Sequence, residues 1–97
     1  MNLSYRQLDP LIHQPARLSI MAALVATKEV EFATMRDTIA ISDSLLSRYT
    51  GQLEEAGYVS VRKGFVGKRP RTWLSVTSAG RKAFAAHVQT LRKIMEQ

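Results

Sequence analysis

The 97-residue sequence contains no cysteine, which excludes a disulfide scaffold, a thiolate metal site and a cysteine nucleophile. Its longest uninterrupted apolar run, Ile20–Ala26, is far shorter than the ~20 residues that a membrane-spanning helix needs. The opening MNLSYRQLDP carries neither a basic leader nor an apolar segment, so we expect no signal peptide. These absences are typical of a protein of the reducing cytoplasm.

Acidic residues are missing from a long part of the chain. Between Ala56 and Met95 there is no aspartate or glutamate, although nine lysines and arginines lie there. The whole chain has a formal net charge of +6. A stretch of one sign and this length is expected to face a polyanion, rather than to be only a solvated surface.

Few residues are suited to catalysis or metal binding. The two histidines, His13 and His87, fall on apolar helical patterns, and no glycine-rich loop has the strand-to-helix context of a phosphate site. No acid lies between His87 and Glu96, so the last helix offers too few metal ligands. We therefore expect no enzyme, no metal site and no cofactor.

The length allows one domain, residues 1–97, with a single core. We expect a short amphipathic N-terminal helix within about 1–13. A second helix should begin at Pro15, whose missing N–H is not needed there, and end near Lys28. Glu29–Phe32 is expected to form a brief strand beside a hairpin, and a third helix should run from about Ala33 to Ile39.

The next helix is the most informative stretch. Ser42 is suited to cap it, Leu46 and Leu53 recur on one face at helical spacing, and Gly57 is placed to end it. Its opposite face is polar and nearly uncharged, with Arg48 as the one base. The three-residue connection to the preceding helix is a helix-turn-helix signal, although the usual glycine is absent from the turn.

A basic β-hairpin follows. The alternating runs 58–62 and 71–76 predict two strands around the loop Lys63–Pro70. Leu74 is expected to face the core, and Trp73 the other side. Phe65 and Val66 at the tip have two interpretations: packing down onto the hairpin, which we expect, or inserting as an apolar wedge between DNA base steps.

The last helix, about 78–97, has an apolar face that is wider and longer than a core of this size can cover. A second subunit is the natural cover, and the alternative is the N-terminal helix of the same chain. The expected homodimer interface consists of Leu3, Leu8, Leu11, Phe84, His87, Val88, Leu91, Ile94 and Met95.

Four stretches, ARLSIMAAL, ISDSLLSRYTGQLEEAGYV, KGFVGKRPRTWLSVT and TSAGRKAF, cover most of residues 10–88. In them the sequence resembles the small single-domain transcriptional regulators of the MarR/ArsR-like winged-helix superfamily. The resemblance implies a winged helix-turn-helix, mainly α with a small β-hairpin wing (α+β), and a dimer that binds DNA. It places the recognition helix, about 43–56, in the major groove and the basic wing, 62–71, on the backbone or minor groove.

The DNA-binding residues expected from this pattern share polar side chains on the helix-turn-helix and wing. They are Thr34, Arg36, Asp43, Ser44, Ser47, Arg48, Gln52, Lys63, Lys68, Arg69 and Arg71. We predict a sequence-specific regulator that binds an inverted repeat of double-stranded DNA as a homodimer. A winged-helix protein-interaction module and a binder of structured RNA or left-handed duplex are the alternatives. The sequence identifies no small-molecule effector.

Overall fold

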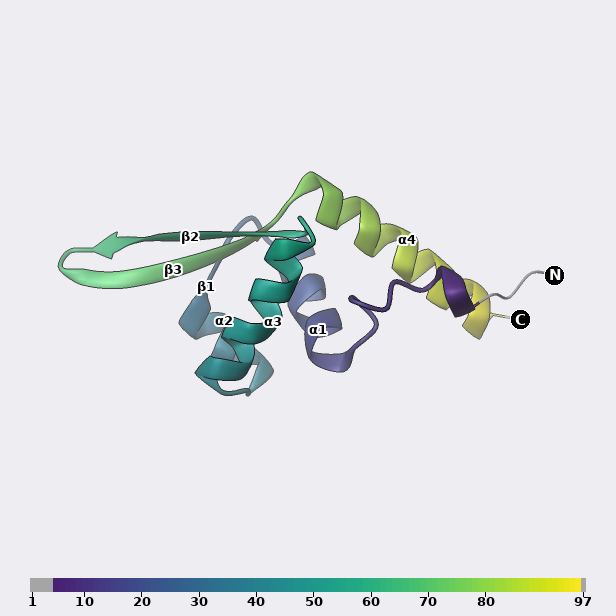
Figure 1. The fold of residues 1–97 in the computed structure, drawn as a ribbon, viewed down its shortest axis with the longest axis horizontal. Coiled ribbons are helices and arrows are strands. Elements are labelled where there is room, and N and C mark those ends of the chain that lie inside the picture. Colours follow the sequence, from purple (N-terminus) through teal and green to yellow (C-terminus); the bar gives the residue numbers. More distant parts are fainter. Residues whose placement is uncertain (1–4, 97) are drawn as a thin grey trace.

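Four α-helices, one 3₁₀ turn and a three-stranded antiparallel sheet make up residues 5–96, the part of the chain that the computed structural model describes (Figure 1). The fold is therefore mainly α with a β-hairpin, which confirms the expected class. In chain order the elements are η1 (Tyr5–Gln7), α1 (Pro15–Val25), β1 (Val30–Glu31), α2 (Phe32–Ile39), α3 (Asp43–Glu55), β2 (Val59–Val66), β3 (Arg69–Val76) and α4 (Ser78–Met95).

The sheet joins the short β1 to the hairpin in the order β1-β3-β2. Val30 pairs with Leu74, which confirms the expected brief strand beside the hairpin. The hairpin itself is longer than predicted, because the expected loop Lys63–Pro70 is mostly strand. Only Gly67 and Lys68 turn the chain. Gly67 has a φ of 62° and Lys68 does not have a positive φ, which is the φ pattern of a type II′ turn and matches the twist of the two strands.

One core lies where α1, α2 and α3 meet the base of the hairpin. Its enclosed side chains are Ile12, Ile20, Met21, Leu24, Met35, Leu46, Leu53, Val59 and Leu74. Each buried leucine or isoleucine contributes about 1.5–3 kcal/mol relative to an exposed one. This core holds α3 and the hairpin in one rigid relationship.

The molecule is elongated, with extents of 57 × 25 × 21 Å. The hairpin and α4 extend from the helical core in opposite directions, and η1 lies beside the far end of α4 (Figure 1). None of the helices within residues 5–96 is long and apolar enough to span a bilayer.

The N-terminal segment differs from the helix expected over about 1–13. Among its described residues only η1 is helical, and turns follow it. The Asp9 side chain explains this, because its Oδ1 accepts hydrogen bonds from the backbone N–H groups of Leu11 (2.9 Å) and Ile12 (3.4 Å). Such bonds compete with a helix. Leu3, expected at the dimer interface, lies outside the described residues.

Candidate nucleic-acid interface

The turn between α2 and α3 lacks glycine but adopts the backbone that glycine favours. Ala40 has φ 59° and ψ 52°, the left-handed region, and its N–H donates to the Arg36 carbonyl. Ser42 then caps α3, since its Oγ accepts from the N–H of Leu45 at 3.1 Å. The two helices are thus joined tightly, as the helix-turn-helix pattern predicts.

Helix α3 divides into a buried face and a polar front. Leu46, Thr50 and Leu53 are buried. Thr50 is compatible with this position because its Oγ1 donates to the Leu46 carbonyl at 2.9 Å. The exposed front carries four residues that are small or flexible, namely Ser44, Ser47, Arg48 and Gly51. An α-helix with such a front can approach another surface closely.

Gln52 does not belong to this front. Its Oε1 accepts from Arg17 of α1 at 3.0 Å, and it lines a separate hollow with Leu11. Arg17 also lies over the Tyr49 ring, 5.4 Å from its centroid. The structure therefore assigns Gln52 to the packing of α3 on α1, which differs from the expected DNA contact.

Arg36 and Asp43 lie at the edge of the front but are bonded to each other. Arg36 reaches Asp43 through one nitrogen and Asp37 through another, both at 2.9 Å. These two carboxylates, Asp37 foremost, raise the pKa of Arg36. Asp43 is thereby oriented and partly neutralised, while Thr34 is exposed nearby.

The outer face of the hairpin is neutralised by acids from other elements. Arg62 forms an ion pair with Glu29 at 2.9 Å and lies over the ring of Trp73, 4.1 Å from its centroid. Arg71 pairs with Glu31 at 3.2 Å. Trp73 is on this face, as expected, and two arginines of the predicted basic footprint have their charges satisfied within the chain.

Four exposed cations lie on α3 and the hairpin without an ion pair in the described part of the chain. Arg48, Lys63, Lys68 and Arg69 are exposed, and none makes an ion pair within residues 5–96. The four side chains are spread over the front of one helix and one projecting hairpin. This spacing suits a phosphate backbone that passes both elements.

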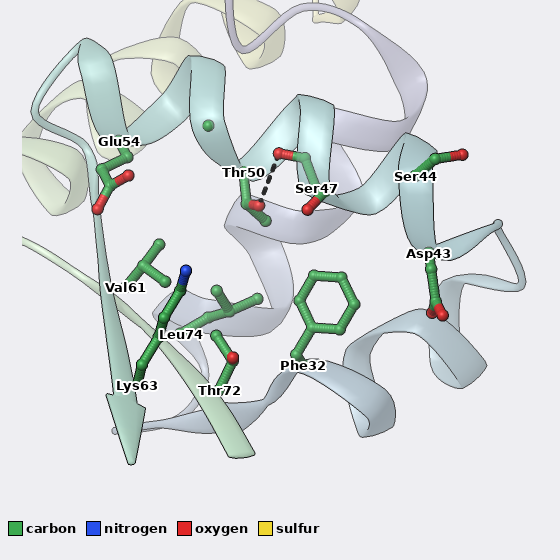
Figure 2. Close-up of a pocket in the computed structure, with 11 residues that line it drawn as sticks. Phe32, Asp43, Ser44, Ser47, Thr50, Glu54, Val61, Lys63, Thr72 and Leu74 are labelled. Atoms are coloured by element: carbon green, nitrogen blue, oxygen red, sulfur yellow. Dashed lines mark hydrogen bonds between the residues drawn. The ribbon is translucent and has the colours of Figure 1, made fainter. Parts of the chain in front are cut away.

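A groove of about 610 Å³ lies between α3 and the hairpin. Figure 2 shows Lys63 of β2 extending along it towards α3, with Phe32 and Leu74 in its apolar lining. Ser44 and Ser47 line the side that belongs to α3. Ser44, Ser47 and the first wing lysine, Lys63, therefore border one depression.

The tip of the hairpin contradicts the preferred sequence interpretation. Phe65 is 73 % exposed and Val66 57 % exposed, so neither packs down onto the hairpin. Phe65 pairs across the strands with Pro70, and Val66 with Arg69. Two exposed apolar side chains thus lie at the tip beside the cations Lys68 and Arg69.

Most residues expected at the dimer interface line α4 and the N-terminal segment. Phe84 and Leu11 pack against the core, and the remainder are half-buried or exposed: Leu8, Val88, Leu91, Ile94 and Met95. Segment η1 lies beside the far end of α4, so part of this face is covered by its own chain (Figure 1). Met95 nevertheless remains 71 % exposed and Tyr5 69 %.

His87 is the clear exception, because it is only 1 % exposed within its own chain. Its Nδ1 accepts from the backbone N–H of Asp9 at 3.0 Å, and its Nε2 lies 3.2 Å from Nδ1 of His13. Nε2 of His87 must then carry the proton and donate to His13. The expected role of His87 as an interface residue is wrong; it anchors the N-terminal segment to α4.

Charge effects support this arrangement. Burial, reinforced by the neighbouring His13, lowers the pKa of His87, while Asp9 acts in the opposite direction. The Tyr58 hydroxyl donates to Asp9 Oδ2 at 2.7 Å, and this bond, together with burial, raises the pKa of Tyr58. The contacts among Asp9, His13, His87 and Tyr58 thus favour the uncharged forms of His87 and Tyr58.

Arg81 has a role that the sequence did not reveal. Its guanidinium donates to the carbonyls of Val25 (3.1 Å) and Thr27 (3.3 Å), at the end of α1. Helix ends leave such carbonyls without partners, so Arg81 caps α1. In the sequence it appeared only as one base in the acid-free stretch.

Comparison with known proteins supports the same architecture. Residues 16–95 match the model of the winged helix DNA-binding domain family. An uncharacterised protein of Methanocaldococcus jannaschii is 25 % identical over 84 residues, which span 87 % of this chain and 91 % of that protein.

Solved structures share the fold. A transcriptional regulator homologue from Pyrococcus horikoshii superposes with a TM-score of 0.83 at 23 % identity, over 89 % of this chain and 85 % of the other. The MarR family regulator Sco3205 of Streptomyces coelicolor, solved in complex with DNA, gives 0.66 at 19 % identity, over 94 % and 66 %. The expected MarR-like architecture is confirmed, and the chain belongs to the winged helix DNA-binding domain family.

Proposed function

We propose that this protein is a sequence-specific regulator of transcription that acts by binding double-stranded DNA. The observation that carries the proposal is the polar front of α3, flanked by unpaired cations on the hairpin. A B-DNA major groove admits an α-helix, and serine and arginine side chains can hydrogen-bond base edges there. Helix α3 enters the major groove, and the hairpin lies along the backbone and minor groove.

The contacts divide into two kinds. Ser44, Ser47 and Arg48 face the bases, while the hairpin cations bind phosphates. Arg36, Asp43 and Arg71 support the interface through ion pairs within the chain. If Lys63, Lys68 and Arg69 of each subunit neutralise three phosphates, a dimer has a log–log salt slope of about −5.

A homodimer completes the proposal. The exposed apolar residues at the far end of α4, together with η1, meet the same surface of a second copy. Because such a dimer is two-fold symmetric, its site is an inverted repeat with half-sites about one helical turn apart. A role on chromosomal DNA places the protein in the cytoplasm, and neither catalysis nor a cofactor is part of the proposal.

Selection of bound sequences from a random duplex pool tests this function directly. At about physiological salt, we expect enrichment of an inverted repeat, with the protein sedimenting as a dimer. Arg48→Ala should weaken binding to the selected site and leave binding to unrelated duplex unchanged. Tight binding without enrichment would contradict sequence specificity. Absence of duplex binding would favour the protein-interaction module, and preference for structured RNA would favour the other alternative.

A further inference from the structure

The tip of the hairpin carries a feature that phosphate binding does not explain. Phosphates need cations and hydrogen-bond donors, yet the outermost residues of β2 are Phe65 and Val66. Phe65 is one of the large apolar side chains that are strongly exposed within residues 5–96, and its exposed fraction of 73 % is the highest among them. Large aromatic side chains dominate the energetics of interfaces, so an exposed one at a projecting tip is suited to contact a partner.

The pleat of the hairpin determines which way this ring faces. Side chains two residues apart in a strand lie on the same face, so Val59, Val61, Lys63 and Phe65 share one face of β2. Val61 and Lys63 line the groove beside α3. Phe65 therefore continues the groove face outward, on the side of the hairpin that α3 also borders, whereas Val66 lies on the opposite face.

The backbone at the tip is well defined. Phe65 is opposite Pro70, which fixes its own φ and lies on the same face. The two-residue turn at Gly67 and Lys68 leaves no slack loop in which the ring could fold back. A phenylalanine side chain has only two rotatable bonds, so little conformational entropy is lost when it becomes ordered.

The charges around the tip select the partner. Lys68 lies in the turn and Arg69 begins β3, so both cations are at the tip. Lys63 lies on the same face of β2 as the Phe65 ring, and no acid is present from Ala56 to Met95. An apolar protein groove would meet three unpaired cations at its rim, while duplex DNA offers phosphates for them and stacked bases for the ring. Apolar side chains inserted from the minor groove between base steps are a known way to unstack and kink DNA.

We propose that Phe65 is such a wedge: it inserts into the minor groove at a base step while the tip cations hold the adjoining phosphates. The inference rests on the proposed function. The inference adds that the protein deforms its DNA site. The base sequence is then also recognised through how easily the base step under the tip unstacks. Pyrimidine–purine steps unstack most readily and are the expected position of Phe65.

The test compares two alanine variants at the same tip. Phe65→Ala removes the wedge, and Val66→Ala removes an exposed apolar residue from the opposite face. We expect Phe65→Ala to weaken binding to the selected site about tenfold for each subunit, in line with the value of one stacked base per half-site. Its salt slope should equal that of the unchanged protein, because no counterion release is lost. Val66→Ala should bind normally.

A direct readout uses 2-aminopurine at successive steps under the tip. Unstacking by the unchanged protein should raise its fluorescence at one step in each half-site, and Phe65→Ala should abolish the rise. Equal affinities and equal fluorescence for both variants, with the unchanged protein still binding DNA, would overturn the wedge alone. Loss of self-association in Phe65→Ala would instead assign the tip to a protein contact and overturn the proposal. Lack of DNA binding by the unchanged protein would remove the proposed function itself.

Discussion

The backbone carbonyl oxygen of Tyr58 occupies the space that a side chain at Gly80 would need: a Cβ atom there would lie 2.2 Å from it. The same oxygen accepts a hydrogen bond from the Thr77 N–H at 3.0 Å. Thr77 also caps α4 through Gly80 and donates to the Gly57 carbonyl. Helix α4 is therefore joined closely to the start of the hairpin.

Gly80→Ala should destabilise the fold strongly. Since the blocking atom is backbone, the first turn of α4 must move away from Tyr58, and overpacking of this kind costs about 3 kcal/mol. Urea denaturation followed by circular dichroism measures the loss. Gly51→Ala is the matched control: nothing lies within 4 Å of its added Cβ, and it should stabilise α3 by about 1 kcal/mol. Equal effects of the two substitutions would contradict the close approach.

Ala40→Gly should stabilise the protein. A left-handed alanine costs roughly 1–2 kcal/mol, which glycine avoids, and the greater freedom of glycine in the unfolded chain offsets about 0.4–1 kcal/mol of the gain. We expect a net gain of about 0.5–1 kcal/mol in the free energy of unfolding, measured in urea. Ala40→Val should lower stability, because a β-branched residue tolerates this backbone poorly. A lower free energy of unfolding for Ala40→Gly would contradict a strained left-handed backbone at position 40.

The order of elements could be predicted because its signals are local. Caps such as Ser42, the helical spacing of Leu46 and Leu53, and the alternation around Leu74 depend only on neighbouring residues. Each of these local signals was strong enough to predict a helix or strand and to show which of its faces is buried. The helix-turn-helix was predictable even with alanine in place of glycine, because the spacing leaves the turn little choice.

Several of the failed predictions depend on residues far apart in the chain. Arg71 was expected to bind DNA, and Arg62 was counted in the basic wing, because nothing local indicates that Glu29 and Glu31 lie beside them. His87 has the spacing of an interface residue, but Asp9 reaches it across 78 positions. The need for glycine at position 80 likewise arises only from the tertiary approach of Tyr58.

Stability should depend on pH through His87. Its pKa is lowered in the fold, so the unfolded chain binds more protons between the native pKa and the ordinary value of about 6.5. The free energy of unfolding should therefore rise with pH across this window, and the contribution should be lost on acidification below it. Each tenfold weakening of the native proton affinity corresponds to about 1.4 kcal/mol. Denaturation series from pH 7.5 to 5 measure this slope.

Two variants separate His87 from other titrating groups. His87→Gln removes the buried imidazole and should flatten the slope, whatever its effect on absolute stability. His13→Gln removes the neighbouring charge that reinforces the shift and should reduce the slope in part. A slope that survives in His87→Gln would assign the pH dependence to another group.

Met95→Glu should weaken self-association. Its side chain is 71 % exposed in the single chain, so the fold tolerates the change, but a carboxylate buried between two copies is strongly unfavourable. Sedimentation should give the Met95→Glu dimer a dissociation constant at least about tenfold higher than that of the unchanged protein. Gln89→Glu introduces the same charge at another exposed position of α4 and should leave the dimer intact. A monomeric unchanged protein at micromolar concentration, or equal behaviour of both variants, would contradict this interface.

Two arginines on the same strand should respond differently when DNA binding is measured against salt. Arg69 makes no ion pair within the described chain, so Arg69→Ala removes one phosphate contact per subunit and should reduce the slope of a dimer by about 1.8, from 0.9 per contact. Arg71 is already paired with Glu31 at 3.2 Å, and Arg71→Ala should leave the slope nearly unchanged. Equal reductions would mean that Arg71 leaves Glu31 and binds DNA. Net charge changes equally in the two variants, so a difference between their slopes can come only from where each charge is held.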